Sequence, residues 1–128
     1  MSGDRPTELF LADIADYARD AVGFLSGHTR DTLDADRKTA YALAWCLCVI
    51  GEAAKHIPRD VRDRRPDLPW RGMASMRDRL IHGYFGIDLN YIWSTVVNDL
   101  PTLTAAVERL RDELLTGPTS PPAEGPPA

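Results

Sequence analysis

A short segment, Met76 to Asp88, gathers the side chains of this chain that are best suited to chemistry. It holds two permanently charged guanidinium groups, a carboxylate, an imidazole that titrates near neutral pH and a phenol. In chain order these are Arg77, Asp78, Arg79, His82 and Tyr84. Such a set suits a phosphodiester substrate, because fixed positive charge stands beside a group that exchanges protons near pH 7.

Cleavage of RNA without a metal ion makes three demands of a site. A base takes the proton of the ribose 2′-hydroxyl, an acid protonates the leaving oxygen, and a fixed positive charge stabilises the phosphorane. His82 and Arg77 could supply these groups. Since one histidine cannot be acid and base at once, this chemistry favours a two-fold dimer that brings a second His82 to the same site.

The spacing of the two residues sets a geometric condition. In an ideal helix, residues five apart differ by about 140° in direction, whereas Asp78 and Arg79 lie within about 60° of His82. Either the helix deforms before Gly83, or Arg77 meets the partner subunit's His82. A solvated arginine near a histidine that caps a helix end is the alternative without catalysis, and the spacing alone does not decide.

Positive charge is concentrated in the same part of the chain. The 128 residues carry a net charge of −4, which argues against a general polyanion binder. Between Lys55 and His82, however, eight Lys and Arg residues stand against four Asp. One face could therefore bind RNA, with Lys55, Arg71 and Arg79 as candidate contacts, although a solvated arginine-rich connector fits the same pattern.

The first half of the chain predicts two long helices. Apolar residues recur at helical spacing from Phe10 to Leu25, with Thr7 as the expected N-cap. A second helix is expected from Leu33 or Asp34 to His56. It is apolar nearly all round between residues 40 and 50, which predicts a central position.

The second half predicts a connector and two further helices. Three prolines between residues 57 and 69 leave room for one helical turn around Val61. A third helix is expected from near Trp70 to His82, ended by Gly83. Asp88 is the expected cap of a fourth helix, with a kink or break near Asp99. No sustained period-two alternation occurs, so the pattern predicts an all-α, up-and-down bundle of four to five helices.

Composition limits the class of protein. No apolar run reaches the roughly 18 residues of a membrane span, and the start of the chain has no export signal pattern, so we expect a cytoplasmic protein without membrane contact. The two cysteines, Cys46 and Cys48, can build neither a disulfide framework nor a zinc site, and we expect no metal and no cofactor. Residues 1–6 are expected to be flexible, residues 7–115 to form one helical domain, and the Pro-rich residues 116–128 to be disordered.

Several other residues have structural interpretations. Trp45, Trp70 and Trp93 lie among aliphatic neighbours and are expected in the core. Gly51 is expected to permit close helix packing, and His56 to act as a charge partner at a helix C-terminus. The long apolar stripes favour a homodimer over a monomer that hides all of this surface within itself.

Three stretches of the sequence together resemble the HepT-like members of the HEPN superfamily. The likeness covers roughly Leu9 to Leu115 and includes the Arg-x4-His-x-Tyr pattern, the IGEAAK element at Ile50 to Lys55, and the Pro-Trp pair at Pro69. These proteins are toxin ribonucleases paired with a minimal nucleotidyltransferase (MNT-type) antitoxin. The resemblance therefore implies a HEPN-like helical domain that cleaves RNA, either mRNA or tRNA.

The resemblance also assigns roles to residues. It implies that Arg77 and His82 are catalytic and that Tyr84 is the tyrosine to which the partner adds AMP. The residue after the arginine is often Asn in this family and is Asp78 here. Asp78 would either position Arg77 or His82, or weaken the electrostatic attraction between Arg77 and phosphate. Two alternatives without catalysis stay open: a helical module that only binds the nucleotidyltransferase, and a scaffold with a vestigial site.

Overall fold

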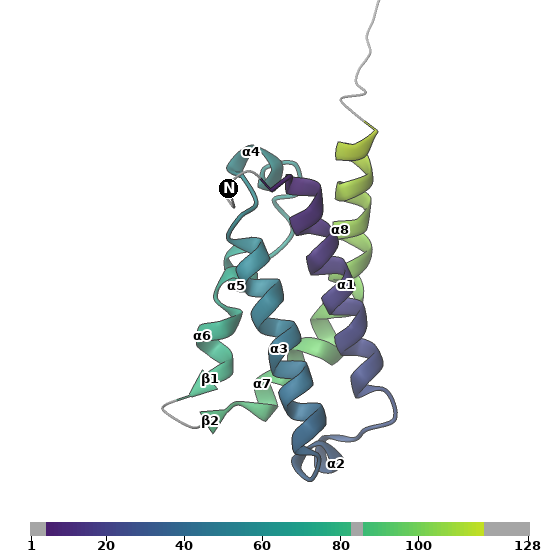
Figure 1. The fold of residues 1–128 in the computed structure, drawn as a ribbon, viewed down its shortest axis with the longest axis vertical. Coiled ribbons are helices and arrows are strands. Elements are labelled where there is room, and N and C mark those ends of the chain that lie inside the picture. The colour runs from purple at the N-terminus through teal and green to yellow at the C-terminus, as the bar shows by residue number, and fades with distance from the viewer. Residues whose placement is uncertain (1–4, 83–85, 117–128) are drawn as a thin grey trace, which may run out of the picture.

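The computed structural model describes residues 5–82 and 86–116, and helices make up almost all of it (Figure 1). Three long helices run side by side: α1 (Thr7–Leu25), α3 (Arg37–Ala54) and α8 (Leu100–Leu115). α1 packs against both of the others. Fully buried side chains from all three, such as Leu11, Leu47 and Leu110, meet in the core. The predicted all-α fold is confirmed.

Shorter elements complete the bundle. α2 (Arg30–Asp34) precedes α3, and α4 (Arg59–Arg62) follows it within the Pro-rich connector. α5 (Trp70–Ala74) and α6 (Met76–Leu80) pack on the other side of α3. The remaining elements are the two-residue strands β1 (Ile81–His82) and β2 (Gly86–Ile87), then α7 (Leu89–Ser94) and the π-helix η2 (Thr95–Asp99).

The first two helices begin differently from the prediction. Thr7 is the first residue of α1, and the cap position belongs to Pro6, which makes no side-chain cap. The second helix is divided, because Asp36 rather than Leu33 or Asp34 caps α3 by accepting a hydrogen bond from Thr39 N. α3 is nevertheless central, since it contacts α1, α2, α5, α6 and α7.

The expected third helix is broken and ends early. It is interrupted at Ser75, and α6 ends at Leu80, two residues before His82. Ile81 is extended and pairs with Ile87 in an antiparallel ladder, while Asp88 N donates a hydrogen bond to Leu80 O. Pairing with a later segment therefore replaces the last turn of the helix.

The fourth helix behaves largely as predicted. Asp88 caps α7 by accepting a hydrogen bond from Tyr91 N, at 2.9 Å. Near Asp99 the helix widens into η2, where Leu100 N donates to Thr95 O. Pro101 explains the irregularity, because it has no N–H for the carbonyl of Val97 and its ring crowds that carbonyl.

The tryptophans do not all lie in the core. Trp70 is buried, with its indole N–H donating to Arg65 O, and Trp93 is half-buried. Trp45 is 63% exposed, which corrects the prediction for this residue. Most of its indole ring therefore lies at the surface of α3, in contact with solvent.

No helix within residues 5–82 and 86–116 is long and apolar enough to cross a membrane. The stretch expected to be disordered lies, apart from Thr116, outside the described residues.

Candidate active site

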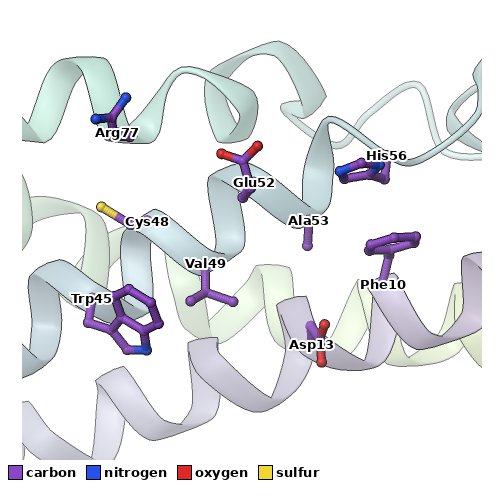
Figure 2. Close-up of a pocket in the computed structure, with 9 residues that line it drawn as sticks. All are labelled: Phe10, Asp13, Trp45, Cys48, Val49, Glu52, Ala53, His56 and Arg77. Atoms are coloured by element: carbon purple, nitrogen blue, oxygen red, sulfur yellow. The ribbon is translucent and has the colours of Figure 1, made fainter. Parts of the chain in front are cut away.

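A cavity of about 440 Å³ lies along α3, between α1 and α6 (Figure 2). Most of its walls are apolar, and polar groups stand at intervals along it. The lining residues are Phe10, Asp13, Trp45, Cys48, Val49, Glu52, Ala53, His56 and Arg77. Of these nine, only Arg77 carries a permanent positive charge. Two carboxylates, Asp13 and Glu52, also line the cavity, and they pair with Arg5 and Lys55. The cavity can therefore present Arg77 to an anionic ligand within a largely apolar surface.

Close packing of α6 on α3 places Arg77 at this cavity. A Cβ built on Gly51 would lie 2.9 Å from Met73 O, 3.5 Å from Met76 Cβ and 3.7 Å from Arg77 N. The two chain segments can approach this closely because residue 51 has no side chain, as the sequence predicted. The position of the Arg77 backbone thus depends directly on a glycine one helix away.

The charge of Arg77 is not neutralised by a neighbouring carboxylate. Within the described part of the chain, its guanidinium has no ion-pair partner within 4 Å, and Glu52 pairs instead with Lys55, at 3.7 Å. Burial raises the pKa of the Cys48 thiol, while the positive charge of Arg77 opposes that shift and Glu52 adds to it. Arg77 is therefore near Cys48 and Glu52, as Figure 2 shows, without a bound counter-ion.

The backbone of His82 lies in β1, paired with Gly86 of β2. The ideal-helix angle between Arg77 and His82 therefore does not apply, because the helix has ended before the histidine. The chain leaves helical geometry at Ile81, which is the first of the two alternatives that the spacing left open. The side chain of His82, and Tyr84 altogether, lie outside the described part of the structure.

The other predicted site residues occupy separate positions. Asp78 is exposed, and among the described residues it forms no ion pair with Arg77 or Arg79. The Arg79 guanidinium lies 5.4 Å from the centroid of the Tyr91 ring, on a different cavity. Lys55 lies beside Glu52, and Arg71 is exposed on α5. The structure does not gather the three predicted RNA contacts into one cluster.

A stacked aromatic pair at the end of the cavity was not foreseen. The rings of Phe10 and His56 stack with centroids 4.5 Å apart and planes 7° from parallel. The Arg5 guanidinium lies over Phe10 at 4.7 Å and pairs with Asp13 at 2.8 Å. His56 was predicted to be a helix-end charge partner, and it is instead part of this stack. No local pattern signals it, because the two rings come from distant parts of the sequence.

Metal ligands are not clustered in the described ranges: no three His, Cys, Asp or Glu side chains there lie close enough to share an ion. Cys46 is buried, and Cys48 is half-buried at the cavity wall.

Comparisons with known proteins identify a family that is consistent with the all-α architecture. The family model described as Ribonuclease HepT-like matches residues 14–110. The chain is similar to "Probable ribonuclease HepT" of Thermococcus cleftensis, with 42% identity over 106 residues, 80% of this chain and 93% of that protein. It is also similar to "Putative RNase MJ0127" of Methanocaldococcus jannaschii, with 42% identity over 101 residues, 79% of this chain and 84% of the other. No solved structure gave a significant match.

Proposed function

Given that this chain belongs to the HepT-like ribonuclease family, we propose that it is a metal-independent endoribonuclease and the toxin of a toxin–antitoxin pair. The ribose 2′-hydroxyl attacks the adjacent phosphorus, the bond to the 5′-oxygen of the next nucleotide breaks, and a 2′,3′-cyclic phosphate end forms. His82 is either the base that takes the 2′-hydroxyl proton or the acid that protonates the leaving 5′-oxygen, and a second copy of His82 performs the other transfer. Arg77 stabilises the negative charge that builds up on the phosphorane.

The unpaired state of Arg77 is the observation that carries this proposal. A guanidinium held by a carboxylate would have to break that pair before it bound phosphate. Arg77 has no such partner among the described residues, and its exposed side chain lines an apolar cavity that a ligand can enter. Donors aimed at developing negative charge typically contribute about 10²–10³ in rate. Asp78 is assigned a positioning role.

A second copy of the chain completes the site in this proposal. Trp45, Tyr41 and Ile81 are 63%, 52% and 41% exposed, and all three line a shallow apolar depression next to the Arg77 cavity. A surface of exposed aromatic side chains is costly for an isolated monomer. Two-fold pairing over α3 would cover it and bring two copies of the Arg77 and His82 segments together, which supplies an acid and a base for one scissile bond.

The family resemblance also implies that a partner controls the activity through Tyr84. We assign to a nucleotidyltransferase the transfer of AMP from ATP to this residue: the phenolic oxygen bonds to the α-phosphorus, pyrophosphate leaves and the phenolic proton is lost. The adduct adds a bulky anion two residues from His82. RNA would then meet both an obstruction and a like charge, so cleavage would stop.

The test is incubation of the purified full-length protein with RNA in EDTA. We expect cleavage to persist, to leave 2′,3′-cyclic phosphate ends, and to fall at least about 10²-fold in Arg77→Ala and His82→Ala. Arg109→Ala is the matched control, since Arg109 is exposed on α8 and lines neither the Arg77 cavity nor the depression. Intact RNA, together with a stable complex with the nucleotidyltransferase, would instead identify a binding module.

A further inference from the structure

A second and larger cavity, of about 590 Å³, lies on the other side of α6. Its walls come from the connector before α5, from α5 to α7, from η2 and from α8. Arg77 lines the first cavity and Arg79 lines the second. Because residues two apart point about 200° away from each other around a helix, α6 is the partition between the two cavities. The volume is within the range of small-molecule sites, roughly 300–1,000 Å³.

The floor of the second cavity is apolar and its rim is polar. Met73, Met76 and Leu103 are buried and form part of the floor. At the rim, the Arg79 guanidinium and the Tyr91 ring form a cation–π pair 5.4 Å apart. An apolar floor bordered by an aromatic ring and a guanidinium plane is the kind of surface on which proteins stack unpaired bases.

The polar groups of the rim have unused hydrogen-bonding capacity. The Asn98 amide nitrogen makes only a long contact, 3.4 Å, with Ser94 Oγ, and its carbonyl oxygen has no partner in the described part of the chain. The Asp99 carboxylate likewise has no hydrogen bond or ion pair there. An amide offers a donor and an acceptor side by side, and a carboxylate accepts from amino groups. These are the requirements for reading the edge of a base.

The charges of the rim disfavour a polyphosphate as the ligand. Arg65 is neutralised by two hydrogen bonds to Asp67, at 2.9 and 2.7 Å. The remaining charges are one cation, Arg79, and one anion, Asp99. A site with this balance suits a neutral planar group that is attached to a single phosphate, which is a nucleotide within an RNA strand.

The π-helix shapes this side of the cavity. Its wider turn, with Leu100 N bonded to Thr95 O, lies where Thr95, Asn98 and Asp99 line the wall. Single π-turns inside helices occur frequently at functional sites. Thr95 is 3% exposed and is the one buried polar residue in the described core, so the turn is anchored at its first residue, while Asn98 and Asp99 are exposed at the rim.

We propose that the second cavity binds one nucleobase of the RNA that is cut, a few nucleotides from the scissile phosphate, and so selects the cleavage position. This inference rests on the proposed ribonuclease activity. A helix with its side chains is about 10–12 Å across, a span that a short stretch of RNA crosses. Asp99 and Asn98 favour bases with an exocyclic amino group, because uracil would present carbonyl oxygens to the carboxylate.

The first test measures binding without cleavage. The ¹⁵N-labelled full chain is titrated with AMP, CMP, GMP and UMP, and with ribose 5-phosphate, which has no base. We expect amide signals of residues 94–99 to shift with the three amino-bearing nucleotides, with about tenfold weaker binding of UMP and no response to ribose 5-phosphate. Asn98→Ala and Asp99→Asn should weaken binding at least about fivefold. Asp112→Asn, an exposed carboxylate on α8 outside the cavity, is the matched control.

The second test maps cut sites on an RNA with randomised bases around each linkage. The wild type should prefer amino-bearing bases at one fixed offset from the cut, and Asn98→Ala and Asp99→Asn should lose that preference while Asp112→Asn keeps it. The proposal would be overturned if none of the four nucleotides shifted the amide signals. It would also be overturned if both variants kept the base preference of the wild type. A cavity that binds a protein partner instead of RNA would give both results. If nucleotides bound but no RNA were cleaved, the proposed ribonuclease activity would be rejected, whereas nucleobase binding in the second cavity would still be supported.

Discussion

The carbonyl oxygen of Met73 lies 2.9 Å from the point at which a Cβ on Gly51 would stand. Real Cβ atoms do not approach backbone oxygens so closely, so any side chain at residue 51 must push α5 and α6 away from α3. Arg77 N is only 3.7 Å from the same point. One methyl group at Gly51 would therefore disturb both the packing of the bundle and the place of Arg77.

Gly51→Ala should accordingly lower the free energy of unfolding by about 1–3 kcal/mol, the usual cost of overpacking. It should also reduce RNA cleavage. Urea denaturation and a cleavage assay measure the two effects. Gly23→Ala is the control, because a Cβ there meets nothing within 4 Å and alanine in a helix is favoured by up to about 1 kcal/mol. Equal stability of the two variants would contradict the close packing.

Trp45→Asp should separate the proposed dimer. Placing a charge on the exposed apolar face of α3 opposes its burial against a second copy. We expect the sedimentation-derived mass to fall to that of one chain, and cleavage to fall with it. Phe24→Asp provides a comparison. Phe24 is also an aromatic residue with an exposed side chain, 47% of it accessible, but it lies on α1 and lines neither the Arg77 cavity nor the depression. A dimer that persists in Trp45→Asp would place the interface elsewhere.

Stability should decline in alkaline solution because of Cys46. Burial raises the pKa of this thiol to about 11 from its usual 9.0. Well below pH 9 the thiol is protonated in both the folded and the unfolded protein. Above pH 9 the thiol ionises in the unfolded chain but stays protonated in the folded one. The free energy of unfolding therefore falls as the pH rises from 9 to 11. The expected loss is about 2–3 kcal/mol. Cys46→Ala should remove most of this decline and Cys48→Ala should not, as urea unfolding at several pH values would show.

Alkylation of Cys48 reports on Arg77. The positive charge of Arg77 opposes the burial that raises the pKa of Cys48, so it increases the thiolate fraction. Arg77→Gln should therefore slow the reaction of Cys48 with iodoacetamide about twofold at pH 8, measured by mass spectrometry of the labelled peptide. Arg109→Gln should leave the rate as it is. If both variants react like the wild type, Arg77 is not close to the thiol.

Local sequence patterns were sufficient to predict most of the helices. The spacing of apolar residues predicted the span of α1 and the central place of α3, the prolines of the connector predicted the turn around Val61, and Asp88 was recognised as a cap. These features depend on contacts within a few residues. The break near Asp99 was predicted for the same reason, because the effect of Pro101 is local.

The parts that sequence reasoning missed depend on distant residues. α6 ends early because Ile81 pairs with Ile87, and the stack of His56 depends on Phe10. Trp45 has the helical spacing of a core residue, but spacing does not show which face of α3 the other helices leave uncovered. Arg77, predicted as the site's cation, lines a cavity, while the catalytic roles of Arg77 and His82 and the modification of Tyr84 stay predictions.

The irregular turn that Pro101 imposes has a further effect on how tolerant the chain is of change. α7, before the turn, contacts α2, α3 and α6, whereas α8, after it, packs on α1. The apolar side chains of α7 and α8, which are continuous in the sequence, thus pack against two different sets of helices. Substitutions between residues 107 and 114 should therefore act mainly on the packing of α8 against α1, whereas those at Tyr91, Asn98 and Asp99 should act mainly on the second cavity, which these residues line.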